Sequence, residues 1–209
     1  MTTNNITCRR IETADEPAFD TMDGSTSAAL AEPDGDSGSR IIQLQEGINS
    51  SSASRVVLQL LQFEAEAPGQ PIHMFIYSPG GCVISGLAII DTMRHVTSPV
   101  FTYAIGFASS MGAVILACGR RGNRYILPHS RVMIHQASGS VGGTMDNVRA
   151  TLAFQSALES EIEILLAEAT GKNVDEIRGA SRVDNWLKAP AAVEFGLVDH
   201  ILTAAPGKI

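Results

Sequence analysis

The chain has 209 residues, enough for one α/β domain with a sizeable hydrophobic core. Its formal net charge of −7 argues against nucleic acid or an anionic membrane as a partner, because both require a basic surface. The three cysteines are odd in number and lack metal-ligand spacing, and the five histidines form no metal motif. We therefore expect a cytoplasmic protein in a reducing compartment, without a metal or another cofactor.

The uncharged segment at residues 96–119 is long enough to be considered as a membrane span. Pro99, Gly106 and Gly112 interrupt it, and it divides into a strand, a turn and a buried helix. The sequence therefore predicts no membrane-spanning segment here.

Residues 1–39 differ in composition from the rest of the chain. Eight carboxylates are interleaved with small polar residues, and only Arg9 and Arg10 oppose them. Such a segment buries little apolar area, so we expect a flexible acidic tail. The alternative is a segment that becomes ordered on a partner or lines a pore. Residues 204–209 are expected to form a short C-terminal tail, which leaves one domain at residues 40–203.

From Arg40 onward, apolar residues recur with the periods of strands and helices. A short strand is expected at residues 41–44. Ser50 to Ser52 are predicted to cap a helix whose apolar face includes Leu60 and Leu61. A strand at residues 72–77 follows. The next helix, at residues 83–96, is expected to turn four side chains inward: Ile84, Leu87, Ile90 and Met93.

The second half of the chain continues this alternation. We expect a buried strand at residues 100–105, a buried helix at 110–118, and short strands at 124–127 and 131–135. A long amphipathic helix at 145–170, a short helix after Asn173, a last helix with Pro190 in its first turn and a strand at 197–202 complete the chain. Strands alternating with helices predict an α/β fold with a mostly parallel sheet.

The first candidate for chemistry is Ser110, in the turn between the strand at 100–105 and the helix after it. A serine at a helix N-terminus lies beside unpaired backbone N–H groups, which favour developing negative charge. Ser110 would attack a carbonyl there, and the N–H of Met111 would bind the oxyanion. Taken alone, Ser109 and Ser110 are also typical helix caps.

Three further positions fit the same chemistry. Gly81 follows a strand end in a Gly-Gly turn, where backbone approaches a ligand closely and offers a second oxyanion donor. His135 ends an apolar strand before a flexible Gly/Ser loop. Asp184 is flanked by Val183 and Trp186 and, if partly buried, would need a donor such as an imidazole N–H. Taken alone, the Gly-Gly turn is as typical of a plain tight turn, while the histidine and the aspartate are more typical of structural residues.

Together these segments resemble successive motifs of the Clp protease proteolytic-subunit family. They are GG at residues 80–81, ASSMG at 108–112, PHSRVMIHQ at 128–136 and APAAVEFGLVD at 189–199. The resemblance covers about residues 40 to 203, and the motifs are long and in the family's order. It implies Ser110 as nucleophile, His135 as base and Asp184 as the residue that orients the base. The oxyanion donors would be the backbone N–H groups of Gly81 and Met111.

The resemblance also implies an architecture and partners. Family members have a crotonase-like fold, a single domain with a protruding handle helix, here at residues 145–170. They form two stacked heptameric rings around a chamber, and an AAA+ ATPase unfoldase feeds unfolded proteins into it. A paralogous proteolytic subunit shares the ring in mixed assemblies. The expected function is that of a serine endopeptidase subunit.

Several residues depart from the family pattern. Tyr77 stands where asparagine is usual, and Ala137 where proline is usual. His73 and Phe75 occupy positions that help to line the unfoldase docking pocket. Arg182 and Val183 stand where an acidic residue and an arginine usually form ion pairs between rings. Two alternatives therefore stay open: a weakly active or partner-dependent component of a mixed ring, and a crotonase-type acyl-CoA enzyme.

Overall fold

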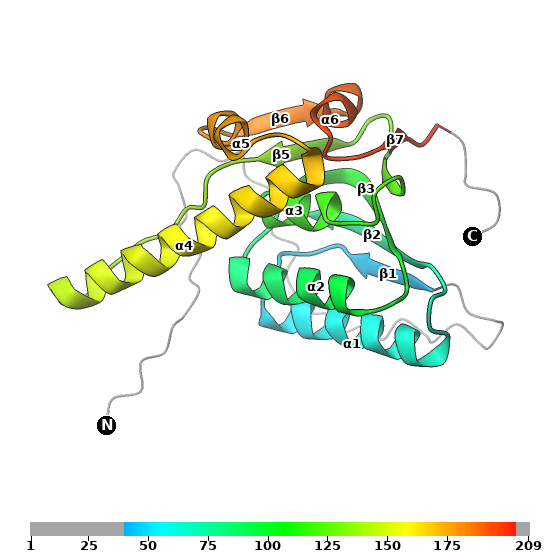
Figure 1. Ribbon diagram of the computed structural model, residues 1–209, viewed down its shortest axis with the longest axis horizontal. Helices are drawn as coiled ribbons and strands as arrows, with labels where there is room; N and C mark the ends of the chain where they lie inside the picture. The colour runs from blue at the N-terminus through cyan, green and yellow to red at the C-terminus, as the bar shows by residue number, and fades with distance from the viewer. Residues whose placement is uncertain (1–39, 204–209) are drawn as a thin grey trace, which may run out of the picture. The chain divides into compact units, whose positions relative to one another are not determined.

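The computed structural model describes residues 40–203; the predictions for residues 1–39 and 204–209 lie outside the described residues. The described part is an α/β unit, as expected (Figure 1). Its strands are β1 (Ile41–Leu44), β2 (Ile72–Ser78), β3 (Val100–Ser109), β4 (Arg124–Ile126), β5 (Arg131–Ile134), β6 (Asn185–Lys188) and β7 (His200–Ile201). Its helices are α1 (Ser50–Glu66), α2 (Val83–His95), α3 (Met111–Ala117), α4 (Met145–Thr170), α5 (Val174–Ala180) and α6 (Ala189–Phe195).

The sheet runs in the order β1-β2-β3-β4-β7, and all of these neighbours are parallel. The ten-residue strand β3 changes its partner along its length. Its first half pairs with β4, through Thr102↔Arg124 to Ala104↔Ile126. Its second half pairs with β5, through Phe107↔Arg131 to Ser109↔Met133. Gly106, with a φ of 66°, lies between the two halves, so β3 pairs with β4 before this glycine and with β5 after it, within one seven-stranded sheet.

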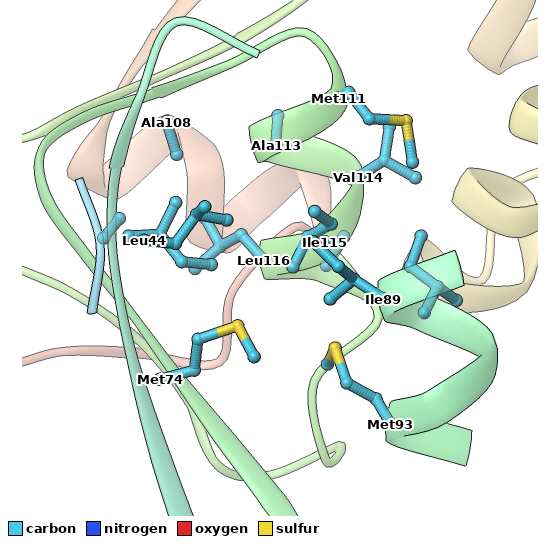
Figure 2. Packing of buried hydrophobic residues seen from close by; sticks show 14 of the residues in the cluster. Leu44, Met74, Ile89, Met93, Ala108, Met111, Ala113, Val114, Ile115 and Leu116 are labelled. Carbon is cyan, nitrogen blue, oxygen red and sulfur yellow. The ribbon is translucent and has the colours of Figure 1, made fainter. Parts of the chain in front are cut away.

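The core lies between the strands and helices α1, α2 and α3. Alternate residues of a strand face the same side, so β1 and β2 direct Leu44 and Met74 into the core. Figure 2 shows these side chains against Leu116 of α3, with Ile89 and Met93 of α2 approaching α3 from the side away from the strands. All seven residues of α3 are buried. The helix that begins at the candidate nucleophile is therefore held on every side.

Helix α4 has two different halves. Its buried residues are Glu163, Leu165 and Leu166, all in the C-terminal half. The N-terminal half extends away from the rest of the described unit (Figure 1). Leu152 and Phe154 on that half are about half exposed. Thr144 caps the start through the N–H of Asn147, and Gly171, in the left-handed conformation, ends the helix as expected.

A buried ion pair joins β4 to the segment that precedes β7. Arg124 donates from Nε and NH2 to the two carboxylate oxygens of Asp199, at 2.9 and 2.6 Å. The same guanidinium donates to the carbonyls of Ala117 and Ala169, at 3.1 and 2.9 Å. Every guanidinium nitrogen of this nearly inaccessible arginine therefore has a hydrogen-bond partner, which is the condition for burying a charge.

Some expectations are wrong in detail. Leu61 and Ile84 are exposed rather than inward, because each lies on a side of its helix that no other part of residues 40–203 covers. The side-chain cap of α1 is Asn49, which accepts from the N–H groups of Ser51 and Ser52. Strand β3 is longer than expected because β5 pairs with its extension, and β7 is shorter because only two residues pair with β4. The edge strand β6 was not predicted.

Candidate active site

Ser110 lies in a strained turn between β3 and α3. Its φ of 54° makes it the one non-glycine residue with positive φ among residues 40–203. Its backbone N–H donates to the carbonyl of Met133 on β5 at 2.9 Å, which holds the turn against that strand. Its carbonyl accepts from the N–H groups of Ala113 and Val114 in the first turn of α3. Strained conformations that the surroundings maintain are typical of functional sites.

The strand register brings three distant residues together. In the parallel pair β3–β5, Ser109 lies opposite Met133, so Ser110 follows at the end of β3. In the antiparallel pair β5–β6, Ile134 lies opposite Asn185. The residue after Ile134 therefore meets the residue before Asn185. These two residues are His135 and Asp184, which are 49 positions apart in the sequence.

The three side chains form a continuous hydrogen-bonded chain. His135 Nε2 lies 2.9 Å from Ser110 Oγ, and His135 Nδ1 lies 3.1 Å from Asp184 Oδ1. A carboxylate only accepts, so we assign the proton to Nδ1, which donates to Asp184. Nε2 then carries a lone pair that accepts from the Ser110 hydroxyl. In this tautomer the imidazole can act as a general base.

The Gly-Gly turn lies directly against the serine. A Cβ on Gly80, whose φ is 88°, would come within 2.6 Å of Ser110 Cβ and 2.9 Å of Met111 N. A Cβ on Gly81, whose φ is 145°, would come within 2.2 Å of the Ile48 carbonyl oxygen. Only glycine fits at either position. Gly80 packs against Ser110, so the next residue, Gly81, lies near the serine, where an oxyanion donor is expected.

Backbone hydrogen bonds fix this turn in place. Ile48 donates to the carbonyl of Gly80 at 2.7 Å, and Cys82 donates to the carbonyl of Ile48 at 2.8 Å. The Ser78 hydroxyl donates to the carbonyl of Glu46 and accepts from the N–H of Gly80. Met111 is the first residue of α3, where N–H groups have no acceptor within the helix. Its N–H is therefore available to an anion at the serine.

The sequence did not predict the backbone hydrogen bond made by the residue that follows His135. The N–H of Gln136 donates to the carbonyl of Ser181 at 2.7 Å, which joins the end of β5 to the end of α5. It also missed β6, whose Asn185–Lys188 alternates between half-buried and exposed residues, as an edge strand does. The sequence NWLK places two apolar residues between two polar ones, so it shows no period-two alternation that could have predicted a strand.

Two other histidines have structural contacts away from the serine. His73 Nδ1 lies 2.7 Å from the Tyr103 hydroxyl, and desolvation by the surrounding rings lowers the pKa of His73. His200 Nε2 lies 3.1 Å from the carbonyl of Gly122. Residues 40–203 contain no cluster of three potential metal-ligating side chains. No helix within the same range has the length and apolarity needed to cross a membrane.

Comparison with known proteins agrees with the motifs. The sequence pattern of the Clp protease family matches residues 37–205. The ATP-dependent Clp protease proteolytic subunit 1 of Prochlorococcus marinus is 43% identical over 169 residues, covering 81% of this chain and 86% of the relative. The subunit 1 of Corynebacterium jeikeium is 40% identical over 166 residues, covering 79% and 88%. The subunit 2 of Corynebacterium glutamicum is 40% identical over 170 residues, covering 81% and 85%. The chain therefore belongs to the Clp protease family, whose proteolytic subunits are serine-type peptidases.

Proposed function

We propose that this chain hydrolyses peptide bonds through Ser110, His135 and Asp184 by an acyl-enzyme mechanism. One observation carries the proposal: the hydrogen-bonded chain from the Ser110 hydroxyl through both imidazole nitrogens to the Asp184 carboxylate, at 2.9 and 3.1 Å. A serine–histidine contact with the histidine oriented by a third group is the arrangement that activates a serine nucleophile.

The first half of the reaction forms the acyl-enzyme. Ser110 Oγ bonds to the carbonyl carbon of the substrate while its proton passes to His135 Nε2. The backbone N–H groups of Gly81 and Met111 bind the resulting oxyanion. The carbon–nitrogen bond then breaks, and Nε2 returns the proton to the leaving amine. Asp184 stabilises the imidazolium that exists between these two transfers.

The second half restores the enzyme. A water molecule attacks the ester carbonyl, its proton passes to His135 Nε2, and the same two N–H groups bind the second oxyanion. The carbon–Oγ bond breaks and Ser110 recovers its proton. The released product is the carboxylic acid end of the cleaved chain, so each cycle consumes one peptide bond and one water molecule.

We propose unfolded polypeptide chains as substrates, cleaved inside a chamber of two stacked heptameric rings in the cytoplasm. Family membership and the relatives' names, which describe ATP-dependent proteases, support this assembly and an AAA+ unfoldase partner. We propose the ATPase as a separate chain, because the family's unfoldase is one and these 209 residues contain no Walker-type phosphate loop of their own. The parallel sheet and the projecting half of α4 support a crotonase-like fold in which α4 is the handle helix.

We propose the sheet face opposite the helices as the unfoldase contact. It carries a shallow hollow with almost entirely apolar lining, suited to an aliphatic side chain from a partner loop. Phe75, one of the two expected docking residues, lies in the lining, and His73 lies beside it through its contact with Tyr103. The other principal lining residues are Tyr103, Ile105, Tyr125, Leu127 and Leu202.

One observation favours a partner-dependent subunit as the second candidate. The Asp184 side chain is 62% exposed, and the neighbouring Val183 is 74% exposed. A carboxylate that solvent reaches is a weaker electrostatic partner for an imidazolium than a desolvated one. A second ring, built from this chain or from a paralogous subunit, would cover this surface and complete the site. The acyl-CoA alternative has no comparable support, and membership of the Clp protease family counts against it.

Two neighbouring serines provide a matched test. Ser110→Ala should abolish hydrolysis of a short fluorogenic peptide and labelling by a fluorophosphonate, with a loss of about 10⁴- to 10⁶-fold in turnover. Ser109→Ala should retain both, because the Ser109 hydroxyl is buried without a hydrogen-bond partner among the described residues. Activity that survives Ser110→Ala but not Ser109→Ala would reject the proposed nucleophile.

A further inference from the structure

The Asp184 carboxylate depends on the backbone around it for its position. Among residues 40–203 its one side-chain hydrogen bond is with His135 Nδ1. Since the side chain is largely exposed, no surrounding protein wall confines it. Its place must therefore be set by the chain on either side. After Asp184 comes β6, an edge strand with alternating exposure. Before it comes α5, which ends only a few residues earlier.

Helix α5 is attached to the unit by apolar side chains, Ile177 and the partly buried Ala180, and by one ion pair to α4. Ile177 is fully buried in the core. Arg178 donates to both carboxylate oxygens of Glu163 on α4, from Nε at 3.0 Å and from NH2 at 2.7 Å. The Glu163 side chain is only 10% exposed. This two-point contact fixes the rotation of α5 on α4 in a way that a single apolar side chain cannot.

The C-terminal end of α5 is linked to both His135 and Asp184: to the histidine segment by a hydrogen bond, and to the aspartate through the chain. Ser181, the C-cap, donates its N–H to the carbonyl of Ile177 at 2.9 Å. Its own carbonyl accepts from the N–H of Gln136, the residue after His135, at 2.7 Å. Asp184 follows Ser181 by three residues. A shift of α5 would therefore move the carboxylate and pull on the segment that carries the imidazole.

We propose that Arg178 and Glu163 are positioning residues for the reaction: their ion pair holds the end of α5 so that Asp184 stays within hydrogen-bond distance of His135. This inference rests on the proposed function. The chemistry is sensitive to such a contact, because a misplacement of about 1 Å at a catalytic group costs about 10²-fold in rate. Among residues 40–203, neither residue has a hydrogen bond or ion pair with Ser110, His135 or Asp184, so we expect an effect on kcat rather than on KM.

A second ion pair on α4 provides the control. Arg94 of α2 donates to Glu168 at 3.0 Å, and both side chains are about half exposed. This pair also joins an arginine to the C-terminal half of α4, but its arginine lies on α2, and within residues 40–203 neither partner has a hydrogen bond or ion pair with α5. Arg178→Met and Arg94→Met make the same chemical change: each removes a guanidinium that pairs with a glutamate of α4 and keeps most of the stem. Arg178→Met also removes the contact of Arg178 with Asp175 within α5.

The experiment measures peptide hydrolysis by the assembled protein for both variants, each in the natural background and combined with Asp184→Asn. Arg178→Met should lower kcat by about 10- to 100-fold with little change in KM, while Arg94→Met should leave both nearly unchanged. If Arg178 acts through Asp184, its effect should shrink to within about twofold once Asp184→Asn has already removed the carboxylate. Thermal unfolding of each variant shows whether the fold is retained.

Three results would overturn the inference. The first is a kcat for Arg178→Met that equals that of Arg94→Met. The second is a loss that stays the same size in the Asp184→Asn background, which would mean a general structural effect. The third applies if Arg178→Met does not fold, in which case Glu163→Gln replaces it, since this variant keeps the shape of the contact and removes one charge. A full kcat for Glu163→Gln would then overturn the inference. If the Ser110→Ala variant still hydrolyses peptides at the natural rate, the proposed function is refuted, and not only this inference.

Discussion

The backbone at Ser110 is strained, and two substitutions can distinguish the effect of this strain on stability from the effect of losing the hydroxyl. The residue has a φ of 54° and a ψ of −126°, a conformation that side chains rarely adopt. Such a residue costs about 1–3 kcal/mol relative to relaxed backbone. Ser110→Ala and Ser110→Gly both remove the hydroxyl. Only glycine removes the Cβ, and with it the strain.

The expected difference between the two variants follows from opposing contributions. Relief of strain stabilises Ser110→Gly by about 1–3 kcal/mol. The greater backbone freedom of glycine in the unfolded chain costs about 0.5–1 kcal/mol. Ser110→Gly should therefore be more stable than Ser110→Ala by about 1 kcal/mol. For a unit of this size that is a rise of about 2–4 °C in Tm.

Thermal unfolding at equal protein concentration tests this difference, because association makes Tm depend on concentration. Both variants should lack peptide hydrolysis. The expected order of Tm places Ser110→Gly above Ser110→Ala. A glycine variant that is less stable than the alanine variant would show that the turn at Ser110 is not strained, and the reasoning from its φ would be refuted.

The turn, the buried ion pair and the ring contact lead to three further predictions. Gly80→Ala should lower kcat/KM by about 10²-fold, because its Cβ would press on Ser110 and on the Met111 N–H; Gly69→Ala, with a similar φ of 78° and nothing within 4 Å, should keep full activity. Burial alone would raise the pKa of Asp199, but hydrogen bonds and charge attraction from Arg124, with the backbone N–H groups of Arg124 and Gly122, lower it. A lowered carboxyl pKa in the folded state stabilises the protein above the ordinary value of about 3.9, and this contribution is lost as the pH falls through the lowered value. Asp199→Asn should therefore lower the free energy of unfolding by about 3–5 kcal/mol at pH 7, as measured in urea titrations. The difference in unfolding free energy between the variant and the natural protein should decrease below about pH 4. A difference that stays the same at every pH would contradict this. Because Arg182 and Val183 cannot form the family's usual ion pairs between rings, ring docking should be weak, and analytical ultracentrifugation should find single rings or smaller species; a fully active double ring that persists at nanomolar protein and high salt would contradict this.

The sequence by itself determined the class of fold and most of its elements. The short apolar run VFTYAI, bounded by Pro99 and Gly106, indicated a buried strand, and the spacing of apolar residues at 83–96 indicated a helix, without reference to the rest of the chain. The signals for several helix ends also lie in the local sequence. As predicted, Asn173 caps α5, Gly171 ends α4 and Pro190 lies in the first turn of α6. The motifs around Ser110 and His135 are local as well, and they indicated the family that the comparisons confirm.

The contacts within the candidate site could not be obtained in this way. Asp184 meets His135 because an unpredicted four-residue edge strand pairs antiparallel with β5 in one register. A strand that short takes its conformation from its partner rather than from its own sequence, and a slip of one residue would turn its side chains to the opposite face. The exposure of Leu61 and Ile84 is likewise decided by which neighbours cover a helix.

The roles of Gly80, Glu163 and Arg178 also depend on tertiary structure. Nothing in the turn around Gly80 indicates that Ser110, thirty positions later, packs against its α-carbon. Nothing in α4 or α5 alone indicates that Glu163 and Arg178 form a two-point contact. Propensity and periodicity report on residues a few positions apart. Contacts between distant segments depend on the register and packing of the whole unit, and those are settled only when the chain has folded.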